Sequence, residues 1–270
     1  QAAEQHDDGK LKKDERFAVQ YTLLRRDLID TALRIRLHFQ DTEARLFKSE
    51  QAFSVTLPTA FGDIELLGKI DRIDAVDGYF RVVDYKSSDT GFKPNDLAAG
   101  TALQLPVYIE AARQMLRDTG MRPAGGYYMK IGASYGGDEG EVLTKGRMRG
   151  ISLNDVPVLS RFSTTLPGGA FAAIDQRVTS SGALHGISKS FFNEQELDGL
   201  LRYAQRLVCE AAERIYSGDN SICPVDGACG YCDYKSVCRM HPLYAGNALR
   251  MPPRFDRSQL TDSASGEAEE

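Results

Sequence analysis

Tryptophan is absent from this sequence of 270 residues, and so is any apolar run near the ~18 residues that a membrane-spanning helix needs. The first residues contain no apolar segment of the kind found in a signal peptide. The phosphate-binding motif G-x-x-x-x-G-K-[ST] is also missing, since Ile70 follows Gly68 and Lys69. The sequence therefore predicts no membrane span, no signal peptide and no ATP site of this type. It also lacks an initiator methionine, which we interpret as the sign of a fragment.

Cysteine is scarce and unevenly placed. The sequence has five, an odd number, and three of them fall between Cys229 and Cys238. This pattern disfavours a disulfide framework and favours reduced, metal-binding cysteines in the cytoplasm. Cys229 and Cys232 can chelate one soft metal with Cys238 in reach, and either Cys223 or His241 would complete a zinc tetrahedron.

Neither sign of charge is in large excess. The net charge of −5 excludes a surface that is basic all over, but nucleic-acid binding depends on local Lys and Arg patches rather than on the sum. Apolar residues make up 42% of the chain, which is enough for a buried core in one large domain or two small ones.

The hydrophobic periodicity predicts an α/β fold. We expect helices over 14–43, 102–117 and 193–217, and strands over 49–57, 63–75, 78–88 and 124–132. An Asp-Gly pair at 77–78 predicts a hairpin, and Asn193, Glu196 and Gly218 predict the ends of the last helix. The first helix should bury the face of Phe17, Tyr21, Leu24, Leu28, Ile35 and Phe39 and expose Arg25, Arg26, Arg34 and Arg36. We divide the chain into a leading amphipathic helix (1–48), a core (49–132), a hairpin-like insertion (133–192), a C-terminal helix with the cysteines (193–241) and a disordered tail (242–270).

Charged residues interrupt the two strands of the predicted hairpin. Asp71 lies in the first strand, and Asp84 and Lys86 lie two apart on one face of the second. Because Asp71 and Asp84 are at similar distances from the turn, we expect both carboxylates at the same end of the sheet. Two carboxylates and a backbone carbonyl, here that of Tyr85, suffice for Mg²⁺, and Lys86 can stabilise developing charge or orient water. An exposed ion pair on a solvated hairpin is the alternative interpretation.

A longer signature surrounds these residues. Gly68-x-x-Asp71, Asp84-x-Lys86 and Gln104-x-x-x-Tyr108 together resemble the RecB-like branch of the PD-(D/E)xK nuclease superfamily. The resemblance implies a restriction-endonuclease-like core, a mixed central sheet flanked by helices, and Mg²⁺- or Mn²⁺-dependent cleavage of DNA. It makes Asp71 and Asp84 metal ligands, Lys86 the catalytic lysine, and Gln104 and Tyr108 an accessory pair. It also makes Glu50 a further acidic ligand.

The cysteine segment resembles the C-terminal motif of AddB-type nucleases, in which three late cysteines and one early cysteine hold a [4Fe–4S] cluster. No cysteine precedes Cys209 here, and no histidine matches that of the family's first nuclease helix. The resemblance implies a bacterial, cytoplasmic exonuclease domain that acts with an AddA-like helicase partner on single-stranded DNA in double-strand break resection. A stand-alone Cas4-like exonuclease and a non-catalytic DNA-binding or scaffolding module are the alternatives. We expect Lys69, Arg72, Arg81 and Lys93 to contact the DNA.

Overall fold

The computed structural model describes residues 15–132, 146–186, 190–241, 243–244, 249–251 and 253–262. Its centre is a six-stranded sheet in the order β1-β2-β3-β4-β5-β8. The strands are β1 (Arg45–Thr59), β2 (Gly62–Val76), β3 (Tyr79–Lys86), β4 (Arg122–Lys130), β5 (Arg149–Leu153) and β8 (Phe191–Phe192). β1, β2 and β3 are antiparallel, β3 pairs with β4 in parallel, β4 pairs with β5 antiparallel, and β5 pairs with β8 in parallel. The sheet is therefore mixed, as the sequence predicted.

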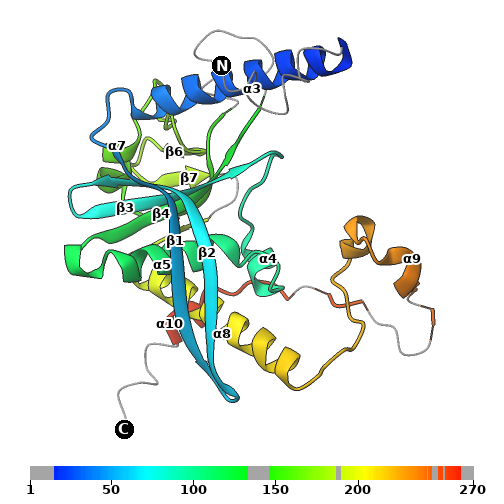
Figure 1. Cartoon of the computed structure of the whole chain (residues 1–270). Coiled ribbons are helices and arrows are strands. Elements are labelled where there is room, and N and C mark those ends of the chain that lie inside the picture. Colours follow the sequence, from blue (N-terminus) through cyan, green and yellow to red (C-terminus); the bar gives the residue numbers. More distant parts are fainter. Residues whose placement is uncertain are drawn as a thin grey trace.

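Helices cover both faces of the sheet (Figure 1). Below it in the figure lie α5 (Gln104–Met115) and α8 (Glu194–Tyr216), whose apolar residues pack with those of β2, β3 and β4 in the larger core. The other face is covered by α3 (Glu15–Phe39) and α7 (Val156–Phe162). Short elements complete the described fold: α4 (Pro94–Ala98), α9 (Lys235–Cys238), α10 (Gln259–Asp262), the 3₁₀ turns η2 (Arg117–Thr119) and η3 (Ala228–Tyr231), and a small β6 (Gln176–Val178) and β7 (Leu184–Gly186) hairpin. In the described ranges, no helix is long and apolar enough to cross a membrane.

The local signals at turns and helix ends are confirmed. β2 and β3 form the predicted hairpin, and Gly78 takes the left-handed conformation (φ 75°) that its turn requires. Asn193 caps α8, and Glu196 closes the capping box from the third helical position. These residues place α8 against the sheet.

Three expectations need correction. First, α3 is not amphipathic in the predicted way: Phe17, Leu24 and Leu28 are exposed, whereas Arg34 is buried and donates to the Gly132 carbonyl at 2.8 Å. Apolar residues lie all round the first turns of this helix, so the spacing did not define one face.

Second, the segment predicted as an insertion contributes to the sheet, because β5 pairs along β4 and β8 pairs along β5. Third, the predicted tail is partly packed. Leu260 of α10 is fully buried in the main core, and the Phe255 ring meets those of Phe192 and Tyr203 edge to face. Residues 133–145 of the insertion and 263–270 of the tail lie outside the described residues.

Candidate active site

The β2–β3 hairpin brings two carboxylates to one end of the sheet. Arg72 pairs with Val83, so Asp71 and Asp84 are the next residues along the two strands. Asp71 Oδ2 accepts a hydrogen bond of 2.8 Å from the Tyr85 amide, which ties the first carboxylate to the second strand. Asp84 is 4% exposed, and this burial raises its pKa, with Lys86 opposing the shift and Asp71 adding to it. The predicted pair is therefore close, and one member is held where its charge is disfavoured.

A network of polar side chains surrounds Asp84. Lys86 Nζ lies 2.6 Å from Asp84 Oδ2 and donates to Gln104 Oε1 at 2.7 Å. The Gln104 amide nitrogen in turn donates to Asp84 Oδ1 at 2.9 Å and to the Tyr108 hydroxyl at 3.1 Å. Lys86 also lies over the Tyr128 ring, 5.2 Å from its centroid. The first turn of α5 thus fixes the orientation of the acidic and basic side chains at the end of β3.

Burial changes the acid–base properties of the surrounding tyrosines as well. Tyr128 is mostly buried beside Asp84 and Tyr108, and desolvation raises its pKa to about 12. Its hydroxyl therefore stays protonated at neutral pH and can only donate or accept a hydrogen bond.

The glycine of the signature has a packing role. A Cβ on Gly68 would come within 2.5 Å of the Phe53 ring, which lies on the neighbouring strand β1. The Phe53 ring contacts the Tyr108 ring edge to face, with centroids 5.6 Å apart. Gly68 therefore lets Phe53 reach the residue that holds Gln104.

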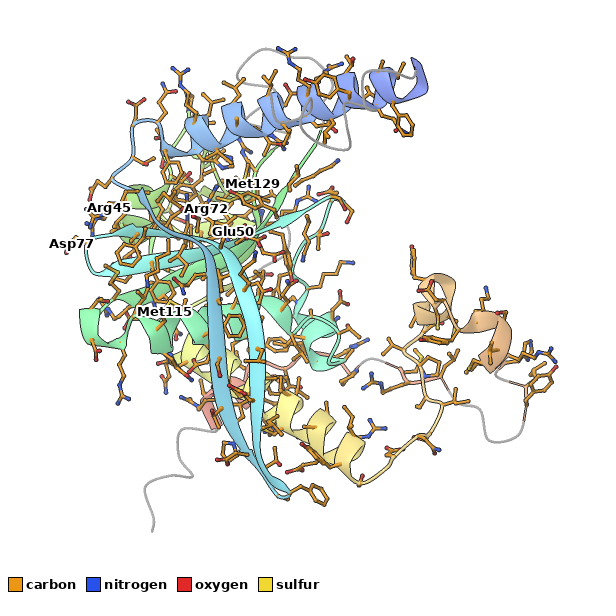
Figure 2. All side chains as sticks on the ribbon, viewed as in Figure 1. Arg45, Glu50, Arg72, Asp77, Met115 and Met129 are labelled. Carbon is orange, nitrogen blue, oxygen red and sulfur yellow. The ribbon has the colours of Figure 1, made fainter. Side chains whose placement is uncertain are left out.

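Glu50 lies beside the acidic pair but is engaged elsewhere. The register pairs Ser49 with Arg72 and Gln51 with Ile70, so Glu50 lies across from Asp71. It adopts a left-handed backbone conformation (φ 51°), and its exposed carboxylate forms an ion pair with Lys69. That pairing raises the pKa of Lys69. Figure 2 shows Glu50 on β1, at the level of the hairpin strands. Its predicted role as a metal ligand remains a prediction, as does that of the Tyr85 carbonyl.

Two of the four predicted DNA-contacting residues are buried, which corrects that prediction. Arg72 is 3% exposed and Arg81 is 1% exposed. Both bind the buried Asp74, Arg72 at 3.1 Å and Arg81 at 2.9 Å. Arg81 also donates to the Phe162 carbonyl, and Arg72 donates to the Tyr85 hydroxyl. Figure 2 shows Arg72 in the interior between α3 and the sheet. These arginines stabilise the fold, whereas Lys69 and Lys93 are exposed.

His38 completes this buried group. It is 1% exposed and lies near Arg34, Arg72 and Arg81. Desolvation, reinforced by the three positive charges, lowers its pKa well below 6.5, so the ring is neutral at physiological pH. Sequence reasoning missed this cluster, although Arg72 and Asp74 are two apart on one strand face and so can pair.

The cysteine segment is exposed and stands apart from the sheet (Figure 1). Cys223, Cys232 and Cys238 are exposed and Cys229 is half-buried. Throughout the residues that the structure describes, no group of three or more His, Cys, Asp or Glu side chains is arranged to hold a metal ion. The predicted cluster is therefore not assembled in this structure, and its ligands remain a prediction.

Comparisons with known proteins bear on this arrangement. A family model described as the PD-(D/E)XK nuclease superfamily matches residues 2–239. The chain belongs to this superfamily. It is 34% identical over 207 residues to AddB, the ATP-dependent helicase/deoxyribonuclease subunit of that type, from Bacillus subtilis (strain 168), covering 69% of this chain and 18% of that protein. The corresponding protein of Clostridium novyi (strain NT) is 26% identical over 297 residues, covering 99% of this chain and 26% of that protein.

The superfamily match agrees with the mixed α/β sheet and with the polar network at the end of β3. The chain spans 18% of the Bacillus subtilis relative and 26% of the Clostridium novyi relative, that is, a fifth to a quarter of their length. What those longer proteins do as a whole is therefore a separate question from what this nuclease fold does.

Proposed function

We propose that this chain is the nuclease domain of an AddB-type helicase–nuclease subunit, and that it hydrolyses DNA phosphodiester bonds with a divalent metal ion. The observation that carries the proposal is the network of Asp84, Lys86, Gln104 and Tyr108, with Asp71 fixed at the same end of the sheet. A solvated surface ion pair would have no need for a buried carboxylate held by a helix-borne amide.

The donor set fits a hard cation. Mg²⁺ or Mn²⁺ prefers oxygen ligands, and Asp71, Asp84, the Tyr85 carbonyl and Glu50 would supply them. Asp84 fits this role because its environment raises its pKa, so a nearby cation would offset the cost of its buried charge. When bound, the metal supplies an activated water and neutralises charge on the scissile phosphate.

The protein side chains would do the positioning. Gln104 holds Asp84 through its amide nitrogen and Lys86 through its carbonyl oxygen, so it fixes their separation. A cation on Asp84 would compete with Lys86 for that carboxylate. Lys86 would then remain held by Gln104 Oε1 with donors left for the attacking water or a phosphate oxygen. Gln104 is thus a positioning residue and Lys86 a catalytic one.

The substrate and partner follow from the named relatives. We propose single-stranded DNA as substrate, fed by an AddA-like helicase partner during recombinational repair of double-strand breaks in the bacterial cytoplasm. The exposed Lys69 and Lys93 are the proposed DNA contacts, since Arg72 and Arg81 are buried. Because these contacts are to phosphates, binding would weaken steeply with salt.

The test compares variants on one hairpin. Asp84→Ala or Lys86→Ala should reduce Mg²⁺-dependent cleavage of single-stranded DNA by at least about 100-fold, because each change removes a group that stabilises the transition state. Asp77→Ala, at the exposed turn of the same hairpin (Figure 2), should cleave like the wild type.

Circular dichroism would check that all three variants fold. Cleavage that persists in both active-site variants would reject these roles. A wild-type chain that binds single-stranded DNA without cutting it would instead support the non-catalytic module.

A further inference from the structure

A second cavity lies on the opposite face of the sheet from the α5 network. It has a volume of about 370 Å³, within the ~300–1,000 Å³ typical of small-molecule sites. Its walls come from the 89–93 loop, which follows β3 directly, and from β4, β5 and the start of β6. The loop begins three residues after Lys86, so this cavity and the candidate active site share one end of β3.

The cavity has an apolar lining with one unsatisfied polar group. Phe92, Tyr127, Met148 and Ile174 are all almost fully buried and supply the apolar walls. Gln176 is 8% exposed, and its Oε1 is buried without a hydrogen-bond partner among the described residues. An unpaired buried carbonyl oxygen is costly, so the site is suited to a ligand that brings an N–H donor.

The orientation of Gln176 is fixed from behind. Its amide nitrogen donates to Ser152 Oγ at 2.7 Å, and Ser152 Oγ is hydrogen-bonded to the Tyr127 hydroxyl at 2.8 Å. Desolvation raises the pKa of Tyr127 to about 12, so this hydroxyl keeps its proton. The Gln176 nitrogen is therefore occupied, and its oxygen is the atom left to recognise a ligand.

Charged residues form the rim. Arg149 binds Asp89 at 3.0 Å and Asp175 at 3.2 Å, which ties the loop to β5 and the β6 side. Lys93 is exposed and has no ion-pair partner among the described residues, so its ammonium group is available to an anion. The cavity thus combines flat apolar walls, a hydrogen-bond acceptor within and a free cation outside.

We propose that this cavity binds one nucleotide of the DNA strand beside the cleavage site, with the base inside and its phosphate at Lys93. Adenine, cytosine and guanine present an exocyclic amine that can donate to Gln176 Oε1, whereas thymine has none. Pockets that read an unstacked base combine apolar contact with such edge hydrogen bonds. The inference rests on the proposed function in taking DNA as the ligand.

Binding of deoxynucleoside monophosphates tests the proposal without catalysis. In EDTA, isothermal titration should show that the wild-type chain binds dCMP about 10-fold more tightly than dTMP, because dTMP leaves the Gln176 oxygen unpaired. Gln176→Leu should weaken dCMP binding to the level of dTMP. Gln114→Leu is the matched control, since Gln114 is an exposed glutamine of α5 whose amide binds only Glu110.

A second variant keeps the test decisive if Gln176→Leu fails to fold. Lys93→Met should weaken dCMP and dTMP by the same factor, because it acts on the phosphate. Absence of dCMP binding to the wild type, or equal binding of dCMP and dTMP, would overturn the inference. Mg²⁺-dependent cleavage without dCMP binding rejects this cavity alone, whereas dCMP binding without cleavage rejects the nuclease proposal alone.

Discussion

At the scale of single residues, the charged side chains of β2 and β3 serve two different purposes. Asp71, Asp84 and Lys86 lie at the end of the strands, where a substrate can approach. Arg72, Asp74 and Arg81 lie further along the same strands and are buried. Breaking a buried ion pair leaves an uncompensated charge and costs about 3–5 kcal/mol, so these three residues are important for stability rather than chemistry.

His38 should make the fold sensitive to acid. Its pKa in the folded chain is well below 6.5, so below about pH 6.5 the unfolded chain binds a proton that the folded chain does not. The free energy of unfolding should therefore fall as the pH drops from about 7 to 5. His38→Leu should flatten this part of the pH profile, because the variant has no such group to protonate.

Denaturant unfolding at several pH values measures this effect. His185→Leu, which removes an exposed histidine in β7, is the control and should leave the slope unchanged. An equal slope in wild type and His38→Leu would show that His38 is not the group responsible.

At the scale of elements, β1 supports the site although it contributes no residue of the polar network. Phe53 on β1 fills the space over Gly68 on β2 and contacts Tyr108 on α5. Three elements are thus coupled to the position of Gln104 through two aromatic rings.

Gly68→Ala should slow cleavage without removing any catalytic group. The new methyl group would displace the Phe53 ring, and the displacement would pass through Tyr108 to Gln104. Misplacing a positioning group by a fraction of an ångström to 1 Å justifies an expected loss of about 10-fold or more in kcat. Single-turnover cleavage measures it.

The double variant Gly68→Ala with Phe53→Leu should recover much of the rate, since the smaller side chain makes room for the methyl group. If the second change instead lowers the rate further, the glycine acts by another route.

Much of this architecture could be predicted from local patterns. The β2–β3 hairpin, β4, α5 and α8 have strong periodicity and clear end signals, and the structure has them within a few residues of the expected bounds. β5 and β8 were missed because they are short and are defined by pairing with distant strands. The burial of Arg72 and Arg81 was missed because a basic residue near an acidic pair also fits a DNA contact. Only the spacing of Arg72 and Asp74 pointed to an internal ion pair.

At the scale of the whole molecule, the described surface has two regions rich in exposed apolar side chains. One is the first half of α3, with Phe17, Leu24 and Leu28, and the other is the cysteine segment, with Tyr231 and Val237. Sizeable apolar patches on a folded domain often mark contact surfaces. The chain spans a fifth to a quarter of the Bacillus subtilis and Clostridium novyi relatives.

The cysteine segment should bind iron and sulfide rather than zinc. We propose that Cys229, Cys232 and Cys238, with Cys223 or a cysteine from outside this chain, hold a [4Fe–4S] cluster. Anaerobically purified protein should then be brown and contain about four iron and four sulfide per chain. Cys232→Ser should lose both, and the thermal midpoint should fall.

Cys209→Ser is the matched control, because Cys209 lies in α8 away from the three clustered cysteines and should not affect the iron content. A colourless protein with one zinc per chain would show that these cysteines, with Cys223 or His241, form a zinc site instead.

The alternation of roles along β2 has a consequence for how this protein tolerates genetic change. In a saturation library read out twice, once for cellular abundance and once for DNA cleavage, adjacent codons of the segment 68–75 should give opposite results. Variants at Asp71 would accumulate to normal levels and be inactive, whereas variants at Arg72 and Asp74 would be depleted before activity could be measured. One contiguous signature would therefore separate into two phenotypes, divided by which side chains face the interior.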